Sequence, residues 1–124
     1  MFFRWIIIEN SLVDKSVIRR YPILSETSFA PTDPARKSRM LKLRVPEPDV
    51  GELVDLITHN IKVPYYCHLY HEDPDDDRLI VVFNNQFFNA RKTDYKEASD
   101  YGISHGVSAE EMEIAPTNVA KEEW

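Results

Sequence analysis

Three side chains with aromatic or imidazole rings recur at every second position of one short stretch: Tyr66, His68 and Tyr70. An extended chain sends alternate side chains to the same face, so these rings share one side of a predicted strand. Lys42 and Arg44 alternate in the same way in an earlier stretch. If both sets lie on one face of a sheet, they form a surface of rings and cations. Such a surface suits an acidic protein or a small anionic ligand, or stacks the bases of single-stranded nucleic acid.

The histidines raise a second hypothesis, a small enzyme with histidine acid–base chemistry. His68 and His71 are three residues apart on the predicted strand, so their side chains point to opposite faces and cannot chelate one metal ion without a bulge. His71 adjoins an acidic loop that would offer it a carboxylate. Asp55 and His59 are neighbours at i and i+4 on a predicted helix, a spacing more typical of a surface contact. We therefore assign no catalytic residue.

The most acidic stretch of the chain falls in a predicted hairpin loop. Asp73, Asp75 and Asp77 alternate like the first three ligands of a calcium-binding loop. The pattern then fails, because Arg78 stands where that loop requires glycine and Asn84 stands where it requires glutamate. We expect a solvated hairpin tip, no metal site and no cofactor.

Charge is unevenly distributed along the chain. Fifteen lysines and arginines against 21 aspartates and glutamates leave a net charge of −6, which argues against nucleic acid and anionic membranes as partners. The segment from Arg19 to Arg44 nevertheless holds seven basic and two acidic residues. Such asymmetry orients an oppositely charged protein or small anionic ligand as it approaches. A homodimer joined through the oppositely charged regions is also left open.

The hydrophobic pattern places these residues on a mostly antiparallel sheet. Alternating or continuous apolar runs predict the strands Phe2–Ile8, Met40–Val45, Tyr65–Glu72, Arg78–Phe83 and Gln86–Lys92. Helical spacing of apolar residues predicts a first helix that ends at Pro22, a second over Val50–Ile61 and a third from Asp94 to about Gly106. The first strand is apolar on both sides and is expected near the centre of the sheet. A tight turn is expected at Asn84 and Asn85.

The predicted fold is an α+β, single-domain sandwich with the order β-α-β-α-β-β-β-α and with helices mainly on one face. Residues 22–37 contain three prolines and are expected to be a long connection. Residues 1–115 form the predicted domain, and residues 116–124 form an acidic C-terminal tail in which Trp124 is the residue most able to dock.

The single cysteine, Cys67, cannot form an intramolecular disulfide and alternates with the rings, so it lies on the core side. It favours a cytoplasmic location. No apolar run approaches the roughly 18 residues of a membrane span.

Our leading hypothesis is a small, non-enzymatic binding or interaction module. Its predicted binding residues are Lys42, Arg44, Tyr66, His68 and Tyr70 on an exposed sheet face. The histidine enzyme and single-stranded nucleic-acid binding are the alternatives. The sequence does not identify the ligand.

Overall fold

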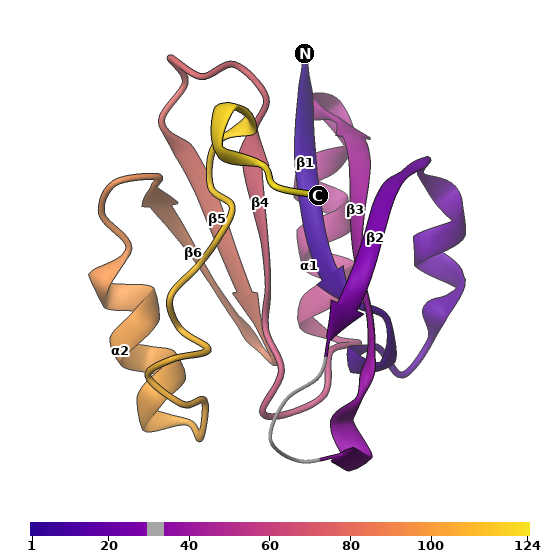
Figure 1. Cartoon of the computed structure of the whole chain (residues 1–124), viewed down its shortest axis with the longest axis vertical. Coiled ribbons are helices and arrows are strands. Elements are labelled where there is room, and N and C mark those ends of the chain that lie inside the picture. The colour runs from indigo at the N-terminus through magenta and orange to yellow at the C-terminus, as the bar shows by residue number, and fades with distance from the viewer. Residues whose placement is uncertain (30–33) are drawn as a thin grey trace.

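The computed structural model describes residues 1–29 and 34–124. Its strands form one six-stranded sheet in the order β2-β3-β1-β4-β5-β6, in which neighbouring strands are antiparallel (Figure 1). The arrangement is compatible with the predicted α+β fold. The strands are β1 (Phe2–Ile8), β2 (Ile23–Phe29), β3 (Ser38–Pro46), β4 (Cys67–His71), β5 (Arg78–Phe83) and β6 (Gln86–Arg91). The helices are α1 (Val50–Thr58) and α2 (Lys96–Ser104), and short 3₁₀ helices span Glu9–Ser11, Lys15–Arg20, Pro34–Arg36, Glu47–Asp49 and Val119–Lys121.

Strand β1 runs through the middle of the sheet, as the sequence predicts. Its consecutive residues Trp5, Ile6 and Ile7 are all at most 3% exposed, because both of its faces are covered. Strands β3 and β4 flank β1, and the connection between them contains α1. Arg4 is the one charged residue of β1.

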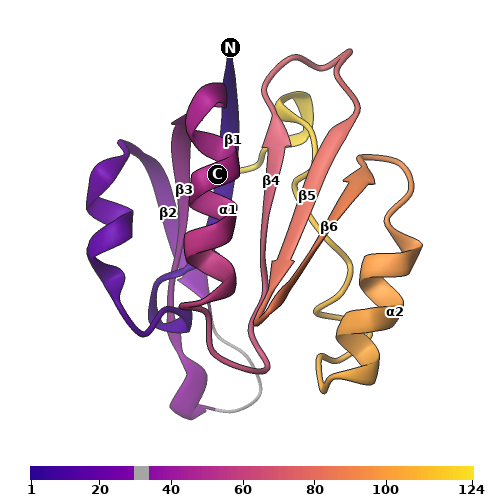
Figure 2. The same ribbon diagram turned by 180° about the vertical axis from the view of Figure 1, so that it is seen from behind.

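Helix α1 covers one face of the central strands (Figure 2). Leu53, Val54 and Ile57 repeat at helical spacing and are buried against a cluster that includes Trp5 and Leu43. Burying each such aliphatic side chain contributes about 1.5–3 kcal/mol. This face therefore forms the larger part of the core.

The opposite face is covered by α2 beside β6 and by residues 107–124, which we call the C-terminal segment (Figure 1). This segment runs back across the sheet towards β1, and its residues Met112 and Ile114 are buried. Ala98 of α2 packs in the same cluster, with Leu79 of β5. The expected placement of the helices mainly on one face is therefore not confirmed.

Two stretches near the N-terminus differ from the sequence-based expectation. Much of the predicted connection over residues 22–37 is the edge strand β2, which pairs with β3; residues 30–33 of that connection lie outside the described residues. The prolines around this stretch predict a loop, but the Ser and Thr residues between them suit an edge strand that is half exposed. In place of the first predicted helix stands the 3₁₀ helix Lys15–Arg20, since Pro22 leaves too little length for a stable α-helix. Within the described part of the chain, no helix is long and apolar enough to cross a membrane.

The predicted tight turn joins β5 to β6. Phe83 pairs with Gln86, and Asn85 between them adopts a φ of 63°. This left-handed region costs a residue with a Cβ about 1–2 kcal/mol, and asparagine tolerates it better than most. The side chain of Asn84 donates a hydrogen bond to the carbonyl oxygen of Ile61 at 2.8 Å, which anchors the turn to the chain after α1.

We expect Asn85→Val to lower the free energy of unfolding by about 1–2 kcal/mol, because a β-branched side chain is strained at positive φ. Asn85→Gly is the matched control, and we expect it to change stability by only about a few tenths of a kcal/mol. Urea denaturation of both variants measures the difference. Equal losses in the two variants would show that the backbone conformation at this position is not what matters.

Candidate functional site

The cations and rings singled out in the sequence lie on one face of the sheet. Residues that are opposite one another in register form two adjacent rows across β3, β1 and β4, namely Arg44, Arg4 and Tyr70, then Lys42, Ile6 and His68. The rings of His68 and Tyr70 stack with 5.9 Å between their centroids. Cys67 packs on the opposite face, with the core under α1.

This face is covered by the C-terminal segment. The Tyr66 hydroxyl donates a hydrogen bond to the carbonyl oxygen of Glu111, and His68 Nε2 lies 2.7 Å from the carbonyl oxygen of Pro116. His68 is 4% exposed and Tyr70 is 0% exposed. The sheet face that we expected to be open is therefore occupied by the chain's own residues, because this side of the sheet also needs an apolar cover.

One carboxylate in the C-terminal segment gathers three donors from the sheet. Glu122 Oε1 lies 3.1 Å from Lys42 Nζ and 3.4 Å from Arg4 Nη1, and the Tyr70 hydroxyl donates to Glu122 Oε2. Lys42 also donates to the main-chain oxygen of Trp124, and its Nζ lies 4.9 Å from the centre of that ring. We call Arg4, Lys42, Tyr70, Glu122 and Trp124 the Glu122 site. Burial and the Glu122 carboxylate raise the pKa of Tyr70, so its hydroxyl remains a donor at neutral pH.

Arg44 lies at the edge of the same face and pairs with Glu72. Its Nε and Nη2 lie 2.7 and 3.1 Å from the two carboxylate oxygens, and these hydrogen bonds raise the pKa of Arg44. Arg4 Nε lies 3.0 Å from the same carboxylate. The Arg44 guanidinium also sits 3.7 Å from the centre of the Phe2 ring. Arg44 is therefore a neighbour of the Glu122 site that shares the Glu72 carboxylate with Arg4.

Other cations of the basic segment pair with acidic residues from distant parts of the chain. Arg36 makes two hydrogen bonds to Glu111, at 3.2 and 3.3 Å, and Arg39 pairs with Glu9 and Glu26. The charge asymmetry seen in the sequence is neutralised at these positions when the chain folds. It therefore contributes less to long-range attraction of a partner than the sequence suggests.

His68 is too weak a base for acid–base catalysis at neutral pH. A carbonyl oxygen only accepts hydrogen bonds, so Nε2 bears the proton that is donated to Pro116. Burial lowers the pKa of His68 to about 4, which leaves the ring uncharged at pH 7. A general base needs a pKa closer to the working pH.

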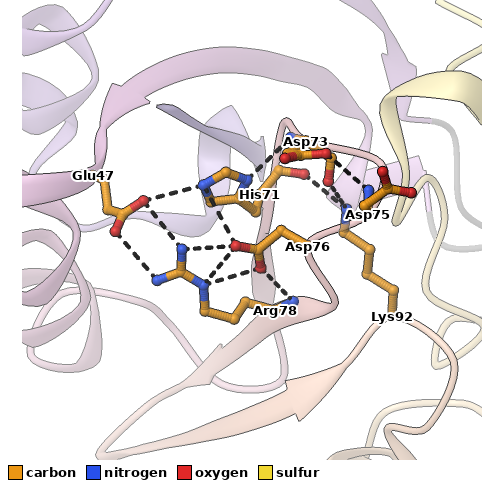
Figure 3. A network of polar contacts seen from close by, with 7 residues as sticks. All are labelled: Glu47, His71, Asp73, Asp75, Asp76, Arg78 and Lys92. Atoms are coloured by element: carbon orange, nitrogen blue, oxygen red, sulfur yellow. Dashed lines mark hydrogen bonds and ion pairs between the residues drawn. The ribbon is translucent and has the colours of Figure 1, made fainter. Parts of the chain in front are cut away.

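His71 points to the other side of the sheet and lies in a polar network with the acidic loop (Figure 3). The backbone N–H of Asp73 donates to Nδ1 at 3.0 Å, so the ring proton is on Nε2, 3.1 Å from Glu47 Oε1. Arg78 bridges Glu47 and Asp76, at 3.1 and 2.9 Å. Both ring nitrogens are occupied and the side chain is 2% exposed. His71 therefore joins the loop to the start of α1 and has no free lone pair for proton transfer.

The acidic loop is held by hydrogen bonds and by one buried cation. Lys92 Nζ donates to the carbonyl oxygens of His71 and Asp73, at 2.8 and 3.1 Å, and the Asp73 carboxylate accepts from the backbone of Asp75 at 2.9 Å (Figure 3). Within residues 1–29 and 34–124, no group of three or more His, Cys, Asp or Glu side chains could hold a metal ion.

The remaining candidates have structural or surface roles. Trp5 Nε1 donates to Cys67 Sγ at 3.4 Å, and burial raises the pKa of this thiol to about 12, so it is not a nucleophile at neutral pH. His59 is exposed, and its Nδ1 lies 2.8 Å from the main-chain oxygen of Asp55 and 3.9 Å from the Asp55 carboxylate.

The predicted binding residues include Lys42 and Tyr70 of the Glu122 site but not its other three members, of which Trp124 was expected only to dock. Arg4 gave a usable signal, because a lone cation in an otherwise apolar central strand must find a partner. Glu122 gave none, since it lies among other polar residues without any periodicity.

No family model, curated protein or solved structure matches this chain. Its function is therefore inferred from the geometry of the site.

The His68 pKa predicts a pH dependence of stability. The unfolded chain binds a proton at His68 near pH 6.5, whereas the folded chain does so only near pH 4. The stabilisation from the uncharged His68 ring should therefore be fully present above pH 6.5. The free energy of unfolding should then decline by roughly 2–3 kcal/mol as the pH falls to 4. NMR titration of the His68 ring and urea denaturation over this pH range test this. A His68 ring that became charged near pH 6.5 in the folded protein would contradict the burial described here.

Cys67 should resist alkylation by iodoacetamide at pH 8 in the folded protein, because the thiol is 1% exposed and its pKa is raised to about 12. Mass spectrometry should detect labelling only after denaturant unfolds the chain. Rapid stoichiometric labelling of the native protein would place Cys67 outside the core.

Proposed function

We propose that this protein is a non-enzymatic interaction module that recognises an acidic, extended peptide of a partner protein at the Glu122 site. One observation carries the proposal: a single carboxylate is held by an ammonium, a guanidinium and a hydroxyl that come from three neighbouring strands. In this structure the carboxylate belongs to the chain's own C-terminal segment. That segment is the intramolecular occupant of the site.

The chemistry of the site selects for a carboxylate. Lys42 is 4% exposed, and removing its charge from water costs several kcal/mol unless a counter-charge is close. Charge-assisted hydrogen bonds of the kind it makes to Glu122 contribute about 1.5–3 kcal/mol each. The aromatic ring of Trp124 stands two residues later, where it contacts the same ammonium. The preferred peptide therefore contains a glutamate followed two positions later by an aromatic residue.

The occupant is held in a way that permits exchange. Within the described residues, the backbone N–H groups of Lys121 and Glu122 bond locally, to Asn118 and Val119, and no backbone–backbone hydrogen bond joins residues 116–124 to a strand. The main-chain oxygens of Pro116 and Trp124 accept from the side chains of His68 and Lys42 instead. No residue from Thr117 to Trp124 is fully buried. Side-chain contacts at the Glu122 site therefore supply most of the attachment, and such segments open at low free-energy cost.

Competition with the attached segment favours a different protein over a second copy of this chain. A tethered segment acts at an effective concentration in the millimolar range, so an identical segment on another molecule cannot displace it at ordinary protein concentrations. A partner must bind more tightly, by offering the same carboxylate and ring with additional contacts. Arg44 lies beside the Glu122 site on the same face, and its side chain is 41% exposed although it is paired with Glu72, so it is placed to make such a contact.

Binding of a fluorescent peptide with the sequence of residues 116–124 tests the proposal in full-length protein. Glu122→Ala weakens the internal occupant, so this variant should bind the peptide roughly tenfold or more tightly than the wild-type chain does. Glu123→Ala is the matched control, because Glu123 is the exposed neighbouring glutamate, and it should behave like wild type. Added salt should weaken binding.

A peptide in which the residue equivalent to Glu122 is alanine should not bind the Glu122→Ala chain. Equal binding of the two peptides, or equal binding by the wild-type and Glu122→Ala chains, would show that the site does not recognise a carboxylate. Self-association of the wild-type chain through exchanged segments, detected by sedimentation, would replace the partner protein with a second copy.

A further inference from the structure

A separate cavity lies on the same face, between the C-terminal segment and strands β1 to β4, with a volume of about 210 Å³. Its apolar lining includes Ile6, Ile8 and Met40, and its polar lining includes His68 and the glutamates at 110, 111 and 113. We call it the His68 pocket. It is smaller than the roughly 300–1,000 Å³ of pockets that hold drug-sized ligands, so it suits a small molecule.

His68 lines this cavity and has an unused hydrogen-bond acceptor. Its Nε2 donates to Pro116, and no donor among the described residues bonds Nδ1. In the part of the chain that the structure describes, the fully enclosed side-chain atoms without a partner are Ser25 Oγ and Arg36 Nε, so the unbonded Nδ1 is not sealed within protein. His68 is 4% exposed, and it is one of the residues that line this cavity. The pocket therefore offers a fixed lone pair that no group of the described structure satisfies.

The charged side chains of the pocket are acceptors as well, and the donor of the Tyr66 hydroxyl is already used. Glu111 is paired with Arg36, and its main-chain oxygen accepts from Tyr66. Glu110 and Glu113 have no cation within ion-pair distance among the described residues. A ligand that fits must therefore supply N–H donors and positive charge together with a short apolar body.

We propose that the His68 pocket binds a small primary amine, whose ammonium group donates to His68 Nδ1 and is balanced by Glu110 and Glu113, while its aliphatic stem contacts Ile6, Ile8 and Met40. The neutral ring is the form that accepts such a bond, and His68 is neutral at pH 7 because burial lowers its pKa. None of these contacts involves Glu122 or Trp124. The amine site and the peptide site can therefore fail independently.

Titration of the full-length protein with butylammonium tests the proposal, with ¹⁵N NMR of the histidine rings as the readout. Formation of a hydrogen bond should shift the Nδ1 resonance of His68 in a saturable manner and leave that of His59 unchanged. Tetraethylammonium has the same charge but no N–H, and butyrate has a similar stem with the opposite charge. Neither should produce the His68 shift.

Variants of the exposed glutamates separate binding from folding. The double variant Glu110→Gln and Glu113→Gln should weaken butylammonium binding about tenfold, whereas Glu97→Gln on α2, away from the pocket, should leave it unchanged. Lysine amide acetylated on its main-chain nitrogen keeps the side-chain ammonium and tests whether the amine can belong to a protein. If this compound binds more weakly than butylammonium, a free amine is the favoured ligand. Equal shifts with tetraethylammonium, no saturable shift at His68, or unaltered binding in the double variant would overturn the proposal.

Discussion

The pairing of buried Lys42 with Glu122 is the interaction on which this face of the molecule depends. The ammonium comes from a strand next to the centre of the sheet and is 4% exposed, so it requires a counter-charge. Among the described residues, the carboxylate within ion-pair distance belongs to Glu122, 80 positions later in the chain. The same carboxylate also accepts from Tyr70, and it thereby fixes the C-terminal segment over the rings of β4. The end of the chain is therefore attached to the sheet by side-chain contacts and by the main-chain oxygens of Pro116 and Trp124, which accept hydrogen bonds from His68 and Lys42.

The two faces of the sheet are covered by different physical means. Under α1 the contacts are apolar and continuous, and they account for most of the core. On the other face, apolar contacts from Met112 and Ile114 give way to polar contacts towards the end of the chain. A polar group that can bond to water when its contact opens contributes little net stability. The end of the C-terminal segment is therefore less stably attached than its beginning. This face presents cations, a hydroxyl and rings, and the segment that covers it is weakly attached at its end. Both features suit a site that binds an acidic peptide.

The sequence predicted the parts of this structure that obey a local period. The bounds of β1 and β5 are correct, α1 and the turn at Asn85 are where the pattern places them, and the rings of β4 share a face with Lys42 and Arg44. Strand β2 was missed because flanking prolines signal a loop, and edge strands have weak alternation. The covering of the predicted face was missed for a different reason. Contacts such as those from Glu122 to Lys42 join positions far apart in sequence, and no local pattern at either residue encodes them.

The two tryptophans allow the most direct measurement of whether the end of the chain is an exchangeable occupant. Trp5 lies in the core, and Trp124 lies on Lys42, so their indole ¹⁵N–H resonances report on the sheet and on the C-terminal segment separately. In a urea titration, the Trp124 resonance should move to its unfolded position at concentrations at which Trp5 is still native. A single transition shared by both resonances would mean that the segment is inseparable from the core, and it would contradict an interaction module that exchanges this segment for a partner.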